Sequence, residues 1–369
     1  MSSTTQRKAH IKPLTSLRFF FALMVYCCHI NFLQDSDITW VKDLYLSTLV
    51  EGFLGVSFFF ILSGFIIAYN YLEKFELGNI VRKDFYKARA ARLYPLTLIC
   101  LFLALPEYLF YHKTDSLSQL GMAFMANITL LQSYIPFKDI YMSFNYPDWS
   151  ISTEMFFYVC FPFIVNALSK SKRKIRALLV VTLILLVTIL VAIPQTSKAL
   201  QHAIYYINPF VRVTDFCIGI LVYLIYNKYR NISWPDYIFT LLETLSLMVF
   251  GVFFIYHSSV NITYRYSVYY WLPMILIIFI FAYQKGYFSR LLSHPTLLLL
   301  GEASFGFYLI HQIAIRYFVF FNKRYFHIEN EILMIVITFS AALLFSILSY
   351  KFVEPKLNIW VKNKLEYKK

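Results

Sequence analysis

Apolar runs long enough to cross a membrane recur along the whole chain. A transmembrane helix needs about 20 predominantly apolar residues to span the roughly 30 Å hydrocarbon core of a bilayer. Runs of this kind lie at about 14–33, 52–72, 92–111, 148–168, 176–194, 209–227, 237–256, 268–284, 297–321 and 330–353. The pattern therefore predicts an all-α integral membrane protein with about ten transmembrane helices, and we interpret residues 1–369 as one polytopic domain with short tails.

A further apolar segment, residues 117–135 with the sequence "LSQLGMAFMANITLLQSYI", does not fit this count. If it crossed the membrane, the chain would have eleven spans and the basic run "SKSKRKIR" would lie outside. We therefore expect a re-entrant or interfacial helix on the outer side. The alternative is an ordinary span with a misplaced neighbour.

Lys and Arg residues are concentrated in every second connection between the predicted spans and in both terminal segments. These positions hold most of the 34 Lys and Arg residues, including the runs "KFELGNIVRKDFYKARAAR", "SKSKRKIR" and "KLNIWVKNKLEYKK". Cytoplasmic loops of membrane proteins accumulate Lys and Arg. We therefore predict that both termini are cytoplasmic.

The composition agrees with a membrane protein and excludes several other classes. Hydrophobic residues make up 59% of the chain and charged residues 15%, whereas soluble domains contain about 25% charged residues. The net charge of +14 indicates contact with anionic membrane lipids rather than with nucleic acid, because the basic clusters adjoin apolar spans. The five cysteines all lie within apolar segments, so we predict no disulfide framework.

The first predicted span, "LTSLRFFFALMVYCCHINFL", contains two ionisable residues, Arg18 and His29. Eleven helical positions correspond to three full turns and about 20°, so both side chains share one face, roughly 16 Å apart along the axis. Each residue also has an ordinary explanation, since arginine can extend to the headgroups and histidine can lie at the interface. The shared face favours a functional role, because polar groups at membrane depth usually face a bundle interior or a water-filled cavity.

Other polar residues lie within predicted spans. Glu154 is near the outer end of the fourth span, while Arg212 and Asp215 are three residues apart and can pair on one helical face. We interpret that pair as a buried structural ion pair. His311, in the ninth span, is interpreted as a hydrogen-bonding group between helices rather than a catalytic residue.

Arg89 and Arg92 lie three residues apart at the expected cytoplasmic start of the third span. On one side of a helix, two guanidinium groups can hold a phosphate by paired hydrogen bonds. From the spacing alone, the excess of basic residues in cytoplasmic loops explains them better.

Taken together, the motifs resemble those of the membrane-bound acyltransferase family 3. In chain order they are Arg18 with His29 after ten intervening residues, "GVSFFFILSGF" ending at Ser63 to Phe65, Arg89 and Arg92 before "LYP", Trp149, Ser150 and Glu154 in "WSISTEMFFY", "SFGFYLIHQ", and "SYKFVEP". Each motif alone is weak, but six in the family's order from Arg18 to Glu354 are specific. Ser57 stands where relatives often have an acidic residue, so we assign that position no role. The chain resembles the stand-alone form without an appended SGNH-type domain.

The resemblance implies a membrane O-acyltransferase of the bacterial cytoplasmic membrane. Such an enzyme moves an acyl group, usually acetyl, from cytoplasmic acetyl-CoA or another acyl-CoA to a hydroxyl of an extracytoplasmic carbohydrate, such as a surface polysaccharide or its lipid-linked precursor. We therefore expect no metal and no permanently bound cofactor. The alternative is a transporter or lipid-linked sugar flippase that uses the buried charges as a proton relay.

Within this interpretation each candidate residue has an expected role. His29 is the general base near neutral pH, Glu154 orients it, and Arg18 stabilises negative charge on the donor or on the oxyanion. Arg89 and Arg92 bind the phosphates of acyl-CoA. The remaining candidates, structural or substrate-lining, are Ser63, Trp149, Ser150, Arg212, Asp215 and His311.

Overall fold

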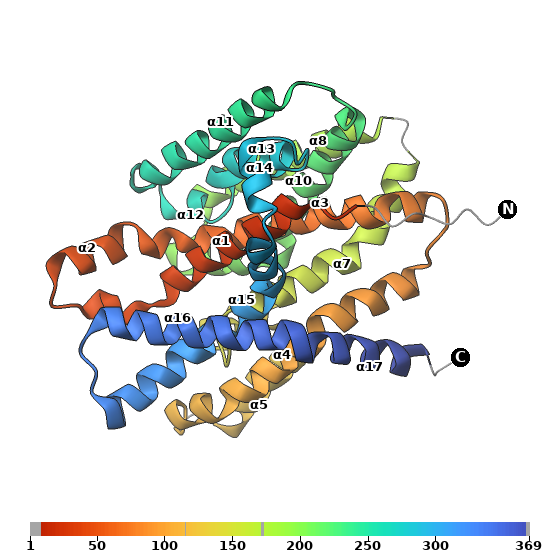
Figure 1. Ribbon diagram of the computed structural model, residues 1–369. Coiled ribbons are helices and arrows are strands. Elements are labelled where there is room, and N and C mark those ends of the chain that lie inside the picture. The colour runs from red at the N-terminus through yellow and green to blue at the C-terminus, as the bar shows by residue number, and fades with distance from the viewer. Residues whose placement is uncertain (1–8, 115, 171–172, 367–369) are drawn as a thin grey trace.

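The computed structural model describes residues 9–114, 116–170 and 173–366, and regular structure in these ranges is helical. Figure 1 shows α1 and α3 in the middle of the bundle, with α11 and α13 on one flank and α4, α5 and α16 on the other. The outermost parts of the predicted cytoplasmic segments, residues 1–8, 171–172 and 367–369, lie outside the described residues.

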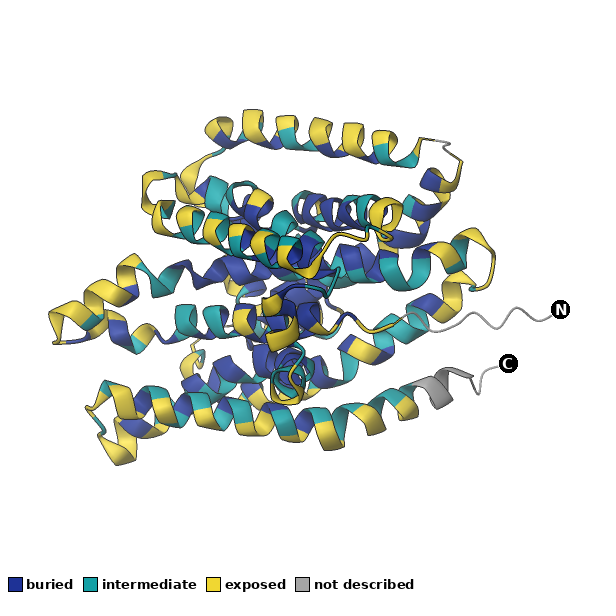
Figure 2. Ribbon diagram, turned by 45° about the horizontal axis from the view of Figure 1, so that its top comes forward, coloured by how far each residue is buried: buried dark blue, intermediate teal, exposed yellow. Residues whose placement is uncertain are grey.

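Nine helices of the described chain are long and apolar enough to cross a membrane, so the protein is a multi-pass membrane protein. They contain α1 (Lys12–His29), α3 (Gly55–Glu76), α4 (Arg82–Tyr111), α7 (Asp148–Ser169), α8 (Lys174–Ala192), α10 (Pro209–Tyr229), α11 (Asp236–Ile255), α15 (Pro295–Phe321) and α16 (Glu331–Leu348). The shorter helices are α2 (Thr39–Ser47), α5 (Leu117–Ile128), α6 (Lys138–Tyr141), α9 (Lys198–Gln201), α12 (Ile262–Arg265), α13 (Trp271–Phe281), α14 (Tyr287–Leu292) and α17 (Glu354–Glu366). Figure 2 shows exposed residues along the outer faces of the helices, where apolar side chains such as Ile184 and Val187 suit contact with lipid.

The predicted span 268–284 differs from the expectation, because its α-helix α13 has only 11 residues. The chain nevertheless passes here from one end of the bundle to the other. The Tyr266 carbonyl accepts a hydrogen bond from Ser57 in the first turn of α3, whereas Gln284 accepts one from the backbone N–H of Lys12 at the start of α1. The residues before Trp271 form turns that hold polar contacts, so helix covers only part of the crossing.

Residues 117–135 enter and leave the bundle at the same end, as predicted. Helix α5 begins at Leu117, shortly after α4 ends, and its last carbonyl, at Ile128, accepts a hydrogen bond from Tyr94 in the first half of α4. The chain then returns to the start of α7, where Ser152 donates a hydrogen bond to the Leu130 carbonyl at 2.6 Å. This segment is therefore a re-entrant hairpin and not a span.

Glycines allow close contact between the helices that surround the site. A Cβ atom at Gly64 of α3 would lie 2.0 Å from the Phe216 carbonyl oxygen of α10, and one at Gly219 would lie 1.9 Å from the Ile61 carbonyl oxygen. A Cβ at Gly301 of α15 would lie 2.1 Å from the Thr15 carbonyl oxygen of α1. Small residues at helix crossings are a common means of close packing in membranes. Gly64 and Gly219 thus allow α3 and α10 to approach closely, and Gly301 does the same for α1 and α15.

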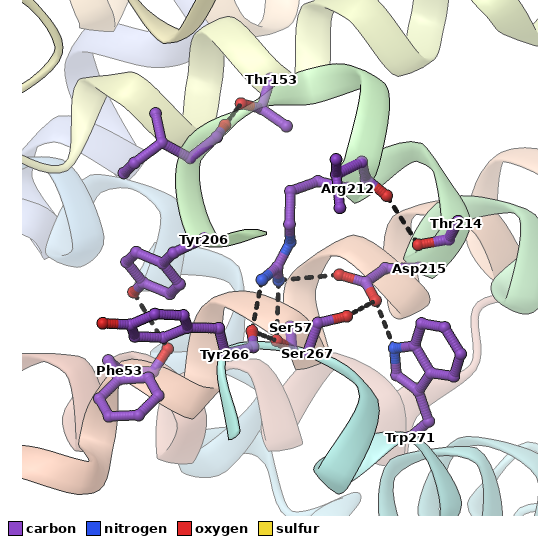
Figure 3. A network of polar contacts seen from close by, with 12 residues as sticks. Phe53, Ser57, Thr153, Tyr206, Arg212, Thr214, Asp215, Tyr266, Ser267 and Trp271 are labelled. Atoms are coloured by element: carbon purple, nitrogen blue, oxygen red, sulfur yellow. Dashed lines mark hydrogen bonds and ion pairs between the residues drawn. The ribbon is translucent and has the colours of Figure 1, made fainter. Parts of the chain in front are cut away.

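A buried polar network joins α3, α10 and the segment before α13 (Figure 3). Arg212 and Asp215 are both fully buried and form an ion pair at 2.8 Å. Arg212 also donates to Ser57 and to the Tyr266 carbonyl, and Asp215 accepts a hydrogen bond from the Trp271 indole at 2.5 Å. Ser57, which received no role from the sequence, is thus an acceptor for a buried guanidinium. These hydrogen bonds offset part of the cost of burying the two charges, although Nε of Arg212 has no hydrogen-bond partner among the described residues.

Candidate active site

A central cavity of about 880 Å³ runs through the bundle between α1, α3, α4, α7 and α15. Helix α3 lines it along one face, through Lys74, Asn70, Ile66, Ser63, Phe59 and Val56. We call the end of the bundle at Lys74, where α3 ends and α4 begins, the basic end. The cavity extends from the basic end to the first turn of α3 at the opposite end.

The cavity brings together several residues that the sequence had singled out. Arg18, Ser63, Arg89, Arg92, Ser150 and Glu154 all line it. His29, Trp149, Arg212, Asp215 and His311 are not among its lining residues. Trp149 is buried and packs its ring against Phe60 and Tyr206, so it supports the wall from behind.

Arg89 and Arg92 line the cavity near its basic end. They lie in the second and third turns of α4, because this helix begins at Arg82, earlier than expected. Arg89 donates a hydrogen bond to the Tyr71 hydroxyl at 2.8 Å and lies over the Tyr71 ring. The exposed Arg92 makes no hydrogen bond or close ion pair with the described residues. Its guanidinium, and the remaining donors of Arg89, are therefore available to an anionic ligand.

Arg18 lines the cavity from α1 and is half-buried. No hydrogen bond or close ion pair within the described chain holds its guanidinium. Its charged neighbours at longer range are Arg92, Glu154 and Glu354. A cation in this setting can bind an anion or a carbonyl oxygen of a ligand in the cavity.

Glu154 lies in the cavity and not beside His29. One of its carboxylate oxygens accepts hydrogen bonds from Ser63 at 2.9 Å and from Tyr158 at 2.5 Å. Helix α7 begins at Asp148, so Glu154 is about 9 Å further along the axis toward the basic end. This placement corrects the expectation that Glu154 orients His29.

The partner of His29 is His311. His29 Nδ1 and His311 Nε2 are 2.8 Å apart, and the two rings stack with centroids at 5.1 Å. His311 is fully buried, and its Nδ1 lies 3.1 Å from the carbonyl oxygen of Phe307. His311 therefore does join two helices, as the sequence suggested, but the residue that it holds is the candidate base.

The hydrogen bonds of this histidine pair define the position of each proton. A carbonyl oxygen only accepts, so His311 must carry its proton on Nδ1, and its Nε2 is then an acceptor. His29 must in turn donate from Nδ1 to His311. Nε2 of His29 keeps an unprotonated lone pair, and the residue is half-buried. A histidine in this tautomer can take a proton from a hydroxyl group.

The cavity comes within one helical turn of the histidine pair. Tyr308 lines its outer end, and the Tyr308 ring centroid lies 6.0 Å from that of His311. The Tyr308 hydroxyl is 2.8 Å from Ser150. Because Ser150 donates its own proton to the Pro147 carbonyl, Tyr308 is the donor to Ser150. Sequence reasoning missed Tyr308, although the spacing of three in "YLIH" places it on the His311 face.

No group of three or more His, Cys, Asp or Glu side chains in the described ranges is arranged to hold a metal ion. The described chain thus combines a histidine pair with a cation-lined cavity inside a helical membrane bundle. A family model described as an acyltransferase domain matches residues 12–351, and the chain belongs to this acyltransferase family. The resemblance found in the sequence motifs is thereby confirmed.

Named relatives agree with this assignment. The chain is 30% identical over 329 residues to acyltransferase MdmB of Streptomyces mycarofaciens, covering 84% of this chain and 80% of the relative. It is 25% identical over 371 residues to O-acetyltransferase OatA of Staphylococcus aureus (strain NCTC 8325 / PS 47), covering 94% of this chain but only 57% of OatA. No solved structure matches the chain. The protein is therefore an O-acyltransferase enzyme of the membrane.

Proposed function

We propose that this enzyme transfers an acyl group, most simply acetyl, from cytoplasmic acyl-CoA to a hydroxyl of an extracytoplasmic carbohydrate. The observation that carries the proposal is that the two ends of the site differ. A cavity with unpaired cations extends from the basic end to within one turn of a histidine base at the opposite end. The name of OatA supports acetyl as the group transferred.

The basic end is the natural cytoplasmic side, because Lys and Arg accumulate in cytoplasmic loops. In this proposed orientation, both termini lie on the cytoplasmic side of a bacterial inner membrane. The CoA phosphates then bind at Lys74, Arg89 and Arg92, where arginine can use its paired donors. The uncharged pantetheine arm extends along the cavity toward Tyr308.

Arg18 serves the donor rather than the oxyanion. It lies eleven residues before His29 on one helix, a separation of roughly 16 Å along the axis, which is too far to contact a thioester beside His29. Its free guanidinium is instead positioned to bind the CoA phosphates or a carbonyl oxygen of the pantetheine arm.

In the chemical step, Nε2 of His29 acts as the general base. This nitrogen removes the proton from the acceptor hydroxyl as the oxygen attacks the thioester carbonyl carbon. A new C–O bond forms, the C–S bond breaks as the tetrahedral intermediate collapses, and the proton passes from His29 to the departing CoA sulfur. His311 keeps the protonated ring of His29 oriented by accepting from Nδ1, as the third member of a catalytic triad does.

The test separates donor binding from transfer. In host cells whose chromosomal copy is deleted, His29→Ala should abolish acetylation of surface carbohydrate, because loss of a general base typically reduces rate by about 10²–10⁴-fold. The purified His29→Ala protein should still be stabilised against heat by acetyl-CoA, as the wild type is. Normal acetylation by His29→Ala, or no acetyl-CoA response in the wild type, would contradict the proposal.

A further inference from the structure

Two aromatic side chains meet in the outer part of the central cavity. Phe59 of α3 and Tyr308 of α15 both line the cavity, and their rings meet edge to face with centroids 5.7 Å apart. The hydrogen bond from Tyr308 to Ser150 of α7 fixes the tyrosine ring from the other side. Three helices therefore contribute to one aromatic wall.

The histidine pair lies directly behind this wall. Tyr308 is one turn from His311 on α15, with ring centroids 6.0 Å apart. The first turn of α3, which holds Val56, is also close to α1. There Gly55 packs against Phe21 and Val25 of α1, and Val25 is four residues before His29. A ligand that enters from the basic end meets Phe59 and Tyr308 before it meets either imidazole.

We propose that Phe59 and Tyr308 form an aperture that admits only a short acyl group from the cavity to His29. The inference rests on the proposed acyl-CoA donor and names a further property of that site. In α3, Phe59 belongs to the face that lines the cavity, so its ring sets the width of the passage. Tyr308 is held by Ser150, which leaves Phe59 as the residue whose size limits the acyl chain.

The expected size of the effect follows from how apolar sites discriminate chain length. One methylene group in such a site changes kcat/KM by about 10–200-fold. Butyryl exceeds acetyl by two methylenes, so the wild type should use butyryl-CoA at least about 10-fold less well. Phe59→Ala removes the whole phenyl ring, a larger volume than the two extra methylenes of butyryl. This variant should therefore largely lose the preference for acetyl-CoA over butyryl-CoA.

The experiment uses membrane vesicles from host cells that lack the chromosomal copy and carry wild type, Phe59→Ala, Phe59→Leu or Tyr308→Phe. Each preparation receives ¹⁴C-acetyl-CoA or ¹⁴C-butyryl-CoA, and base-labile label in the carbohydrate fraction is measured. The butyryl-to-acetyl ratio should rise at least about 10-fold in Phe59→Ala and less in Phe59→Leu. It should rise less in Tyr308→Phe than in Phe59→Ala, because this variant keeps the ring but loses the hydrogen bond to Ser150. Phe58→Leu is the matched control, since Phe58 is buried against Phe21 and does not line the cavity.

The outcomes separate this inference from the proposed function. Absence of acetyl transfer by the wild type would refute the proposed function itself. Acetyl transfer with an unchanged butyryl-to-acetyl ratio in Phe59→Ala would refute only the aperture, as would equal wild-type use of both donors. If Phe59→Ala does not accumulate in the membrane, the ratio in Phe59→Leu decides.

Discussion

Removing the His311 side chain tests the hydrogen-bonded histidine pair in isolation from the rest of the site. In His311→Ala, Nδ1 of His29 loses its acceptor at 2.8 Å, and the ring is no longer confined to the tautomer with a free Nε2. The hydrogen bond to Phe307 is also lost. We expect kcat to fall by about 10²–10³-fold, equivalent to roughly 3–4 kcal/mol of activation free energy, with little change in KM for acyl-CoA.

A conservative variant distinguishes positioning from packing. The carbonyl of His311→Gln can accept from Nδ1 of His29, so this variant should recover much of the activity lost in His311→Ala. His257→Ala is the control, because His257 hydrogen-bonds to the Phe254 carbonyl away from the cavity, and it should keep the wild-type kcat. Initial rates with ¹⁴C-acetyl-CoA, at matched membrane levels, measure all three. A kcat for His311→Ala within threefold of wild type would refute the reasoning.

Three further predictions concern the cavity and the buried network. Arg89→Ala and Arg92→Ala should each raise the acyl-CoA Kd by about 10-fold or more and leave kcat at saturation unchanged, as titration and rates can show. Arg18→Ala should weaken donor binding in the same assays, and Arg18→Lys should restore it only if a point charge suffices; unchanged binding in Arg18→Ala would remove its donor role. Arg212→Ala should lower the free energy of unfolding in detergent by about 3–5 kcal/mol, because Asp215 stays buried without its partner, whereas Arg212→Met with Asp215→Leu should be less damaging.

Local sequence patterns accounted for most of the fold. Apolar length identified the long helices, and the excess of Lys and Arg in alternate connections separated the re-entrant hairpin at 117–135 from the true spans. The same reasoning overestimated the helix at 268–284. There Tyr266 and Ser267, before Trp271, are used for contacts with Ser57 and Asp215, which are distant in the sequence.

The site was harder to predict because its decisive contacts are long-range. Periodicity placed Arg18 and His29 on one face of a helix, and Arg18 does line the cavity. The His29–His311 contact joins residues 282 positions apart, and no local pattern indicates it. The span that holds Glu154 begins at residue 148, as predicted, but the contact of Glu154 with Ser63 joins residues 91 positions apart, and no local pattern indicates it.

Sidedness of transfer tests the central claim most directly. Vesicles from the deletion host that carry the enzyme can be prepared inside-out, with the basic end facing the medium, or right-side-out. We predict that ¹⁴C-acetyl-CoA added to the medium labels carbohydrate in the lumen of inside-out vesicles, and that intact right-side-out vesicles stay unlabelled until they are permeabilised. Labelling of intact right-side-out vesicles by external acetyl-CoA, equal to that of inside-out vesicles, would contradict a donor cavity that opens at the basic end and a histidine base that serves the other side.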